Sequence, residues 1–159
     1  MDADTGQIVA AALTGPEVDD AAQVGPLLEQ IDGTVASFTG EGAYDEDGVY
    51  DAIAQRHPDA AVIIPPRSDA VLSETAATTP TQRDGHVQVI TEHGRMAWQK
   101  ASRYNRRARA EAVISRFKRV IGDALRSRTD QRRATEVAIA VEVLNRMLAL
   151  GRPNYVRIA

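Results

Sequence analysis

The pattern of apolar residues changes part-way along this 159-residue chain, and that change limits the folds that the chain can adopt. Up to Pro65-Pro66, short apolar segments alternate with amphipathic ones. The short segments predict strands at 7–14, 34–39 and 60–64. The amphipathic segments predict helices at 19–31 and 45–57. From residue 83 the pattern is helical, with helices expected at 84–93, within 95–126 and at 129–150. Strands alternating with helices, followed by a run of helices, predict an α/β fold with a helical C-terminal lobe.

Residues suited to capping mark several of these boundaries. Asp45 is expected to be the N-cap of the helix at 45–57, because its carboxylate can accept a hydrogen bond from a free backbone N–H group. Gly94 and Gly151 are expected to end the helices that precede them. The sequence therefore divides into an α/β part, a polar loop and a helical part, at residues 1–67, 68–83 and 84–159.

Composition excludes several classes of protein. Hydrophobic residues make up 43% of the chain and aromatic residues 4%, so Val, Ile, Leu and Ala must fill the core of a folded domain. The chain has no cysteine, which excludes disulfides and thiolate metal sites and suits a reducing cytoplasm. No apolar run approaches the ~20 residues of a membrane span, so we expect no membrane association.

Charge is distributed very unevenly behind a formal net charge of -3. Residues 1–55 hold 12 Asp or Glu and no Lys or Arg. Residues 95–133 hold 13 Lys or Arg against Glu111, Asp123 and Asp130, a balance of 13 − 3 = +10. Such asymmetry predicts a polyanionic partner for the basic segment. The alternative is a solvated basic surface that faces the acidic half of the chain.

Four residues of the basic segment recur at helical spacing. Arg107, Glu111 and Lys118 follow Tyr104 at offsets of 3, 7 and 14 residues. On one α-helix these offsets define a stripe roughly 60° wide. A carboxylate among cations that can hold phosphates suits metal-assisted phosphoryl transfer on DNA. The alternative is a solvated basic face in which Glu111 pairs with Arg107 or Arg109.

The Tyr-x2-Arg-x3-Glu-x6-Lys pattern resembles the signature of DDE-class insertion-sequence transposases. Further segments resemble the same family in the same order: Asp4–Ala10, Thr39–Asp45, Ile64–Arg67 and Leu144–Met147. The resemblance covers nearly the whole chain and implies an RNase H-like fold. The first strand of that fold, with its catalytic Asp, has no counterpart in these residues. We therefore expect an incomplete RNase H-like fold, with a mixed sheet lacking its first strand, in a truncated domain.

The chemistry that the resemblance implies needs two divalent cations held by carboxylates, with Mg²⁺ or Mn²⁺ as the natural choice. Glu111 matches the third acidic residue of the family. Glu41 stands where the family has its second catalytic Asp. We expect Glu41 and Glu111 to be the catalytic, metal-binding residues, and Tyr104, Arg107 and Lys118 to bind DNA.

The resulting expectation is a transposase of a DNA insertion sequence, catalytically impaired and located with the nucleoid in a bacterial cytoplasm. One alternative is a non-catalytic module that binds DNA or transposase and interferes with a full-length relative. Another is a metal-dependent nuclease completed in trans by an upstream segment. Expected partners are DNA and either a second copy of the chain or a full-length transposase.

A few other residues admit two roles. Trp98 is expected in the core, with stacking on an extruded base as the alternative. His57, His86 and His93 show no metal-ligand spacing and are expected on the surface. Without the missing strand, the strands at 7–14 and 60–64 are expected to expose apolar faces.

Overall fold

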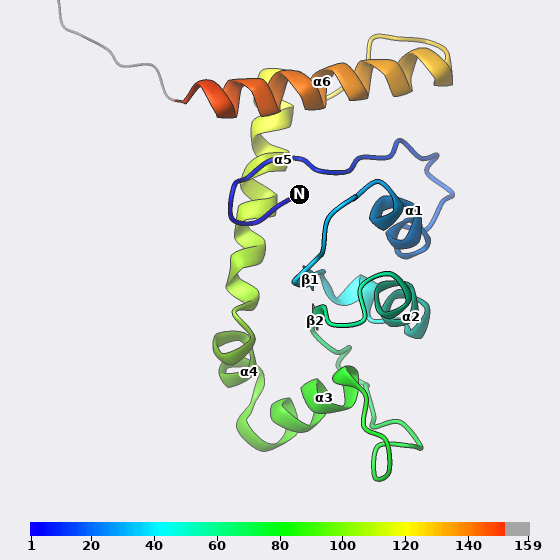
Figure 1. The fold of residues 1–159 in the computed structure, drawn as a ribbon, viewed down its shortest axis with the longest axis vertical. Coiled ribbons are helices and arrows are strands. Elements are labelled where there is room, and N and C mark those ends of the chain that lie inside the picture. Colours follow the sequence, from blue (N-terminus) through cyan, green and yellow to red (C-terminus); the bar gives the residue numbers. More distant parts are fainter. Residues whose placement is uncertain (152–159) are drawn as a thin grey trace, which may run out of the picture. The chain divides into compact units, whose positions relative to one another are not determined.

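The computed structural model describes residues 1–151, which form two compact units (Figure 1). The α/β unit is Thr14–Ala108; the helical unit combines Met1–Leu13 with Arg109–Ala159, of which 152–159 lie outside the described residues. The described α-helices are α1 (Val24–Glu29), α2 (Asp47–Arg56), α3 (Gln82–His93), α4 (Arg95–Ser102), α5 (Ala108–Val120) and α6 (Asp130–Leu150). The strands are β1 (Ser37–Thr39) and β2 (Ala61–Ile63), and the 3-10 helices are η1 (Ala21–Gln23), η2 (Gly42–Tyr44) and η3 (Tyr104–Arg107).

The sheet of the α/β unit is a parallel pair of strands. β1 and β2 pair in the register Ser37–Ala61, Phe38–Val62 and Thr39–Ile63. Helix α2 connects the two strands, as a parallel pair requires. Helices α1 and α2 lie next to each other on the same side of the strands (Figure 1). The predicted α/β class is confirmed, with strands at two of the three expected places.

The core of this unit is aliphatic, as the scarcity of aromatic residues predicts. Its buried members come from η1, α1, α2 and the β2 segment: Ala21, Val24, Leu28, Val49, Ile53, Ala60, Val62 and Ile64. The β2 segment is therefore covered, and the expectation that it exposes an apolar face is wrong. Its contacts with α3 and its burial against α2 complete a local core around two strands.

The expected strand at 7–14 is not a strand within the described part of the chain. The backbone of Ile8 is instead bound by the side chain of Asn145 in α6. Ile8 N donates to Asn145 Oδ1, and Asn145 Nδ2 donates to Ile8 O, both at 2.9 Å. One amide side chain thus supplies the donor and the acceptor that a neighbouring strand would offer. Val9 and Leu13 remain exposed, as expected.

Helix ends follow local capping chemistry where the sequence shows it clearly. Helix α6 begins after Thr129 and ends at Gly151, whose φ is 75°. Gly94, with a φ of 83°, ends α3. Both glycines adopt the left-handed conformation that other residues rarely accept, so these two predicted helix ends are confirmed. Within the described residues, no helix has the length and apolar character needed to cross a membrane.

The segment after Gly94 does not form one continuous α-helix. Arg103 has a left-handed φ of 59° and ends α4, where its N–H donates to Gln99 O. Tyr104–Arg107 then forms the 3-10 helix η3 before α5 begins. The prediction that Tyr104, Arg107, Glu111 and Lys118 share a stripe of one α-helix is therefore wrong. The 3-10 helix advances by 120° per residue, so the expected angles do not apply across it.

The loop before α3 is fixed by the buried carboxylate of Asp84. Its oxygens accept hydrogen bonds from Ser73 N at 2.7 Å, Ser73 Oγ at 2.8 Å and Thr81 N at 2.9 Å. The Thr81 hydroxyl accepts in turn from Asp84 N, which completes a capping box. The backbone N–H groups of Ser73 and then Thr81 hold the pKa of Asp84 well below its ordinary value of 3.8.

We predict that Asp84→Asn flattens the acid dependence of stability. A folded-state pKa below the unfolded value stabilises the fold at higher pH, and this contribution is lost as pH falls through the folded pKa. Wild-type melting temperatures should therefore drop more steeply below about pH 4 than those of Asp84→Asn. Asp59→Asn, which changes an exposed carboxylate, should keep the wild-type profile. Parallel profiles for wild type and Asp84→Asn would contradict this role.

Candidate functional site

Glu41 lies at the carboxyl end of β1. Gly40 extends the strand pairing through a 3.2 Å hydrogen bond from its N–H to Ile63 O, and Glu41 follows directly. A Cβ at Gly40 would come within 3.1 Å of the Phe38 ring and 3.3 Å of Tyr44, so glycine permits this close turn. Parallel sheets bind ligands beyond the carboxyl ends of their strands. The fold therefore places Glu41 where a functional carboxylate is expected.

The Glu41 carboxylate is engaged by Arg107. Arg107 Nη2 donates to Glu41 Oε2 at 2.7 Å, and both residues belong to the α/β unit. The two side chains are 30% and 51% exposed, respectively. A pair with this much solvent access stabilises a fold by about 0.2–1 kcal/mol at most. The guanidinium also places a positive charge next to the Glu41 carboxylate and uses its Oε2 atom.

Tyr104 is positioned by a chain of aromatic contacts that begins at β2. His86 Nε2 donates to Val62 O at 2.7 Å, and His86 Nδ1 accepts from Trp98 Nε1 at 2.9 Å. The Tyr104 ring packs against Trp98 at a centroid distance of 5.4 Å. Trp98 is 1% exposed, so the expectation of a core tryptophan is confirmed.

The expectation of a surface role is wrong for His86, because both ring nitrogens are used inside the unit. Since Nδ1 accepts a hydrogen bond, the imidazole proton lies on Nε2. The prediction holds for His93, which is exposed. His57 is partly buried and accepts a 3.4 Å hydrogen bond from Val35 N.

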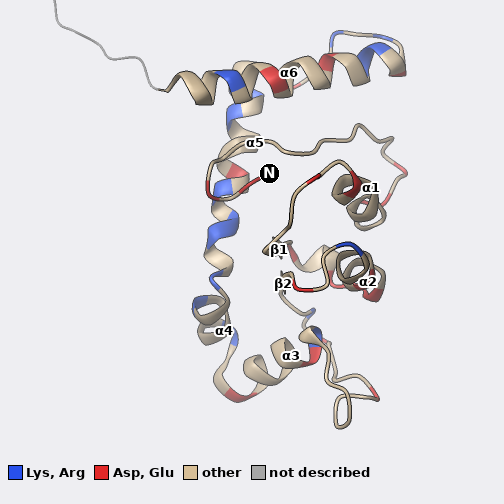
Figure 2. Ribbon diagram, in the orientation of Figure 1, with Lys and Arg blue, Asp and Glu red and all other residues tan. Residues whose placement is uncertain are grey.

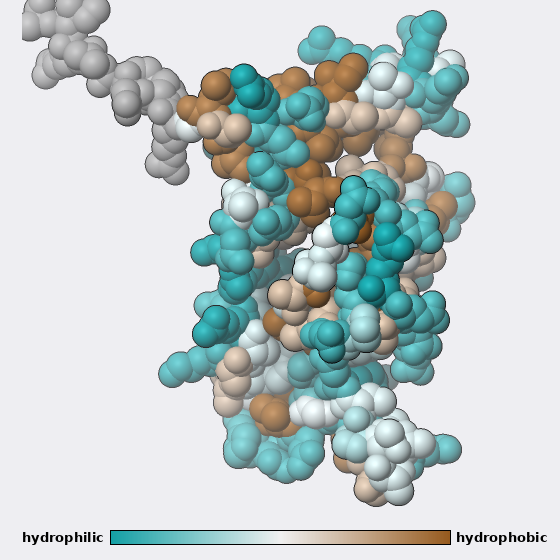
Figure 3. All heavy atoms as spheres, in the orientation of Figure 1, coloured by the Kyte–Doolittle hydropathy of each residue, from teal (hydrophilic) through white to brown (hydrophobic). Residues whose placement is uncertain are grey.

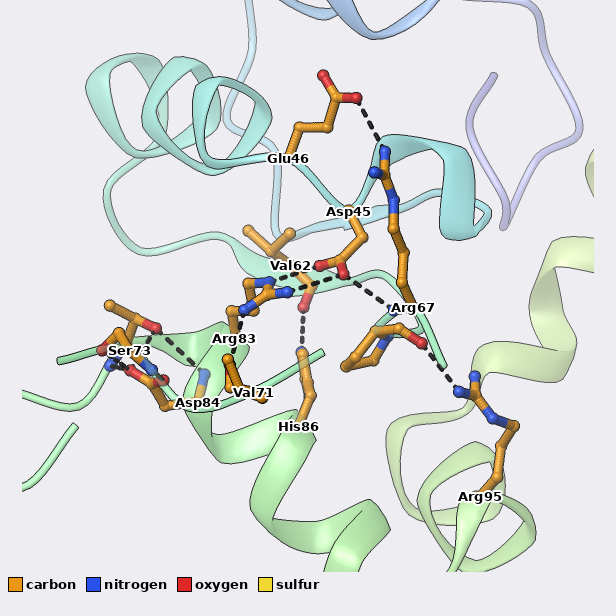
Figure 4. Close-up of polar contacts among 12 residues, drawn as sticks. Asp45, Glu46, Val62, Arg67, Val71, Ser73, Arg83, Asp84, His86 and Arg95 are labelled. Carbon is orange, nitrogen blue, oxygen red and sulfur yellow. Dashed lines mark hydrogen bonds and ion pairs between the residues drawn. The ribbon is translucent and has the colours of Figure 1, made fainter. Parts of the chain in front are cut away.

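Asp45 is a buried ion-pair partner rather than the helix cap that its sequence position predicts. The N-cap of α2 is Glu46. The Asp45 side chain is fully buried, and its oxygens accept from Arg83 Nε at 2.8 Å, Arg83 Nη2 at 3.1 Å and Arg67 N at 2.9 Å (Figure 4). The hydrogen bond to Asp45 raises the pKa of Arg83. Burial, followed by the charge of Asp45, raises the pKa of Tyr50.

The sequence held one clue to this cluster. Asp45 and Arg67 end the two segments 39–45 and 64–67 that resemble the transposase family, and the fold joins them through the Arg67 N–H group. Arg83 carried no comparable clue, because it lies 38 residues beyond Asp45 in the chain. Through these contacts Asp45, which follows β1, is joined to Arg67, which follows β2, and to Arg83 of α3. Asp45 lies four residues after Glu41 in the chain.

Glu111 and Lys118 lie on α5 in the helical unit. Seven residues separate them, which places both on one face of the helix about 20° apart. Both residues are exposed. Arg109 of the same helix is used within its own unit, where Nη1 donates to Ala3 O and lies 3.7 Å from Asp4 Oδ1.

Cations line α5, whereas α1 and α2 carry the acidic residues Glu29, Asp47 and Asp51 and one cation, Arg56 (Figure 2). The cationic residues of α5 are Arg109, Arg116, Lys118 and Arg119. The uneven distribution of charge along the sequence therefore appears in the fold as a mainly basic helix α5 and mainly acidic helices α1 and α2. A basic helix of this kind suits contact with a phosphate backbone, which requires charge and position rather than base-specific groups.

The carboxylates of the described residues do not by themselves fit a pair of divalent metals. Residues 1–151 contain no group of three or more His, Cys, Asp or Glu side chains placed to hold a metal ion. Glu41 is bound by Arg107, and Asp45 is bound by Arg83. We therefore assign no reaction step to metal ions at these side chains.

Comparison with protein families finds a match. The model of the family described as "Transposase DDE domain" matches residues 1–146. This span includes the Glu41 turn, the Arg107 contact and the Glu111 face of α5. No solved structure matches the chain. The family supports a transposase function, and DDE transposases generally use divalent metal ions. Since the match covers most of its length, the chain belongs to the transposase DDE domain family.

Proposed function

We propose that this chain is a transposase of the insertion-sequence type that binds DNA through its basic segment at 95–133 and does not cleave DNA on its own. Two facts support the insertion-sequence assignment: the family match, and the spacing of Tyr104, Arg107, Glu111 and Lys118. The observation that carries the functional proposal is the ion pair between Arg107 and Glu41.

The Glu41–Arg107 pair argues against cleavage in two ways. Glu41 replaces the Asp that the family pattern has, and its extra methylene displaces the carboxylate by roughly 1.5 Å, an error that can cost ~10²-fold in rate. Arg107 also neutralises this carboxylate directly. A metal ion at Glu41 would compete with this guanidinium for Oε2.

Glu41 and Glu111 are the two carboxylates that we assign to the metal site of the family. Mg²⁺ or Mn²⁺ would suit their hard oxygen atoms. Two-metal chemistry uses carboxylates that fix both ions about 3.5–4 Å apart. Two acids, one of them paired with an arginine, are too few for that arrangement.

We also propose that the α/β unit is the RNase H-like part of the domain. Its support is the parallel β1–α2–β2 arrangement with Glu41 at the carboxyl end of β1. On sequence grounds we assign this part to 1–67 and the DNA-binding helices to 84–159, joined by the loop at 68–83. The two compact units follow a different boundary, because residues 1–13 pack with the C-terminal helices.

DNA binding through phosphate contacts requires no metal ion. The segment at 95–133 carries the balance of +10, and α5 contributes four of its cations (Figure 2). We assign phosphate contacts to Tyr104, Arg107 and Lys118. The aromatic packing of Tyr104 against Trp98 fixes the backbone from which Arg107 extends.

The same charge supports a second candidate function. A chain that occupies DNA without cutting it would compete with a cleaving relative for the same DNA ends. It would then act as a non-catalytic DNA- or transposase-binding module. Co-expression with an active full-length relative separates the two functions, since an interfering module lowers the transposition frequency of that relative.

We predict that the purified chain shows no strand cleavage or transfer with Mg²⁺ or Mn²⁺ on duplex DNA carrying the ends of its element. Activity should not exceed that of Glu111→Gln, the matched control. Glu41→Asp alone should also stay at this level, because shortening one side chain does not supply a third carboxylate. Cleavage by the wild-type chain that disappears in Glu111→Gln would refute the proposal.

DNA binding is predicted to be largely sequence-independent and strongly dependent on salt. If about four to six phosphates are neutralised, log K should fall with log[salt] at a slope of roughly -4 to -5. Replacing both Arg107 and Lys118 with Gln should flatten this slope by about 2 and weaken binding to all sequences alike. Fluorescence anisotropy at several salt concentrations measures both effects.

A matched control for this experiment replaces Arg56 and Arg67 with Gln. It removes the same charge outside the basic segment and should leave the slope within about 0.5 of the wild-type value. An equal loss of slope in both double variants would show that net charge, rather than the basic segment, drives binding. No binding at low ionic strength would contradict the proposal altogether.

A further inference from the structure

The ion pair between Glu41 and Arg107 joins two segments that the α/β unit holds in place. Glu41 directly follows Gly40, whose backbone still pairs with the β2 strand. Arg107 ends η3, and the Tyr104 ring at the start of η3 packs against Trp98 of α4. The backbone on each side of the ion pair is therefore anchored within one compact unit.

The contacts behind η3 lead back to the same pair of strands. Trp98 Nε1 donates to His86 Nδ1 at 2.9 Å, and His86 Nε2 donates to Val62 O in β2 at 2.7 Å. Strand β2 in turn pairs with β1, which precedes Glu41. The Arg107 side chain therefore extends from a fixed backbone position toward Glu41, rather than from a loop that could turn away.

Arg107 is the residue at which two anions meet in the proposed function. Without DNA, its Nη2 atom donates to Glu41 Oε2 at 2.7 Å. With DNA, the phosphate contact that we assign to Arg107 uses the same guanidinium. A carboxylate and a phosphate bound to one guanidinium would lie close enough to repel each other. A phosphate that reaches Arg107 is therefore expected to displace the Glu41 carboxylate.

The charge of the basic segment decides which anion Arg107 keeps when DNA is present. Residues 95–133 carry a balance of +10, so several phosphates can bind at once. Hydrophilic atoms are visible along α5, which belongs to this segment, in Figure 3. Glu41 offers a single carboxylate in a partly exposed pair, which is a weak interaction. DNA should therefore win the competition, but with an affinity lowered by the loss of the ion pair.

We propose that Glu41 is a positioning residue for DNA binding, which holds Arg107 in the chain without DNA and releases it to a backbone phosphate when DNA binds. This inference rests on the proposed DNA-binding function and names a residue that regulates it. Because the two contacts exclude each other, Glu41 lowers the affinity for DNA, and bound DNA releases the Glu41 carboxylate. The coupling is reciprocal, so removing the carboxylate charge strengthens DNA binding.

Fluorescence anisotropy with the full chain and a labelled DNA duplex at low ionic strength tests the proposal as a double-mutant cycle. Glu41→Gln keeps the size of the side chain and removes its charge, so it should lower the Kd about two- to fivefold. In the Arg107→Gln background the same change should alter the Kd by less than about 1.5-fold, because no arginine remains to be released. A damaged fold would weaken binding rather than strengthen it, and circular dichroism checks each variant.

Glu46→Gln is the matched control. It removes the same charge from another partly exposed ion pair, whose partner Arg67 lies 2.9 Å away and outside the basic segment. It should change the Kd by less than about 1.5-fold.

Two results would overturn the proposal while leaving DNA binding itself intact. One is unchanged or weaker binding by Glu41→Gln. The other is an equal gain of affinity for Glu41→Gln with and without Arg107, or for Glu41→Gln and Glu46→Gln, because net charge alone would then explain the gain. A wild-type chain that does not bind the duplex refutes both this proposal and the proposed function.

Discussion

The buried carboxylate of Asp45 is the constraint on which the α/β unit depends. It accepts hydrogen bonds from the Arg83 side chain and from the Arg67 backbone, so it joins α3 to the segments that leave β1 and β2 (Figure 4). Removing one partner of a buried charged pair typically costs ~3–5 kcal/mol. Since Arg83 keeps some solvent access, the lower end of that range applies here. The Glu41 turn begins four residues before this anchor and takes its position from it.

The site next to Asp45 has a carboxylate where a catalytic residue is expected, but that carboxylate is engaged in an ion pair. Glu41 lies beyond the carboxyl end of a parallel strand, where α/β proteins place their ligands. Its carboxylate nevertheless meets a guanidinium, and the Tyr104 ring packs against Trp98, which in turn donates a hydrogen bond to His86. Positive charge, in contrast, remains abundant along α5 (Figure 2). This balance is the physical basis for the proposal that the chain binds DNA through its basic segment.

Sequence patterns predicted the features of the fold that depend on residues close together in the chain. The strands at 37–39 and 61–63, the ends of α6 and the aliphatic core follow from apolar spacing, caps and composition. These patterns did not predict the role of Asp45. An Asp at the start of a helix suits an N-cap, and only the folded structure shows that Arg83, 38 residues later, lies against it. The patterns also did not predict the helix end at Arg103, because residues with a left-handed conformation are usually glycines and this one is an arginine. The contact of Asn145 with Ile8 spans 137 residues and lies beyond any local rule.

The central proposal is that Glu41 and Glu111 do not hold a pair of metal ions, and Mn²⁺ titration followed by amide NMR tests it most directly. Paramagnetic Mn²⁺ broadens the amide signals near any site that it occupies. We expect weak, non-saturating broadening spread over the acidic surface, and Gly40–Gly42 should be affected no more than α1. Saturable broadening at both Glu41 and Glu111, lost in Glu41→Gln and in Glu111→Gln, would contradict the claim.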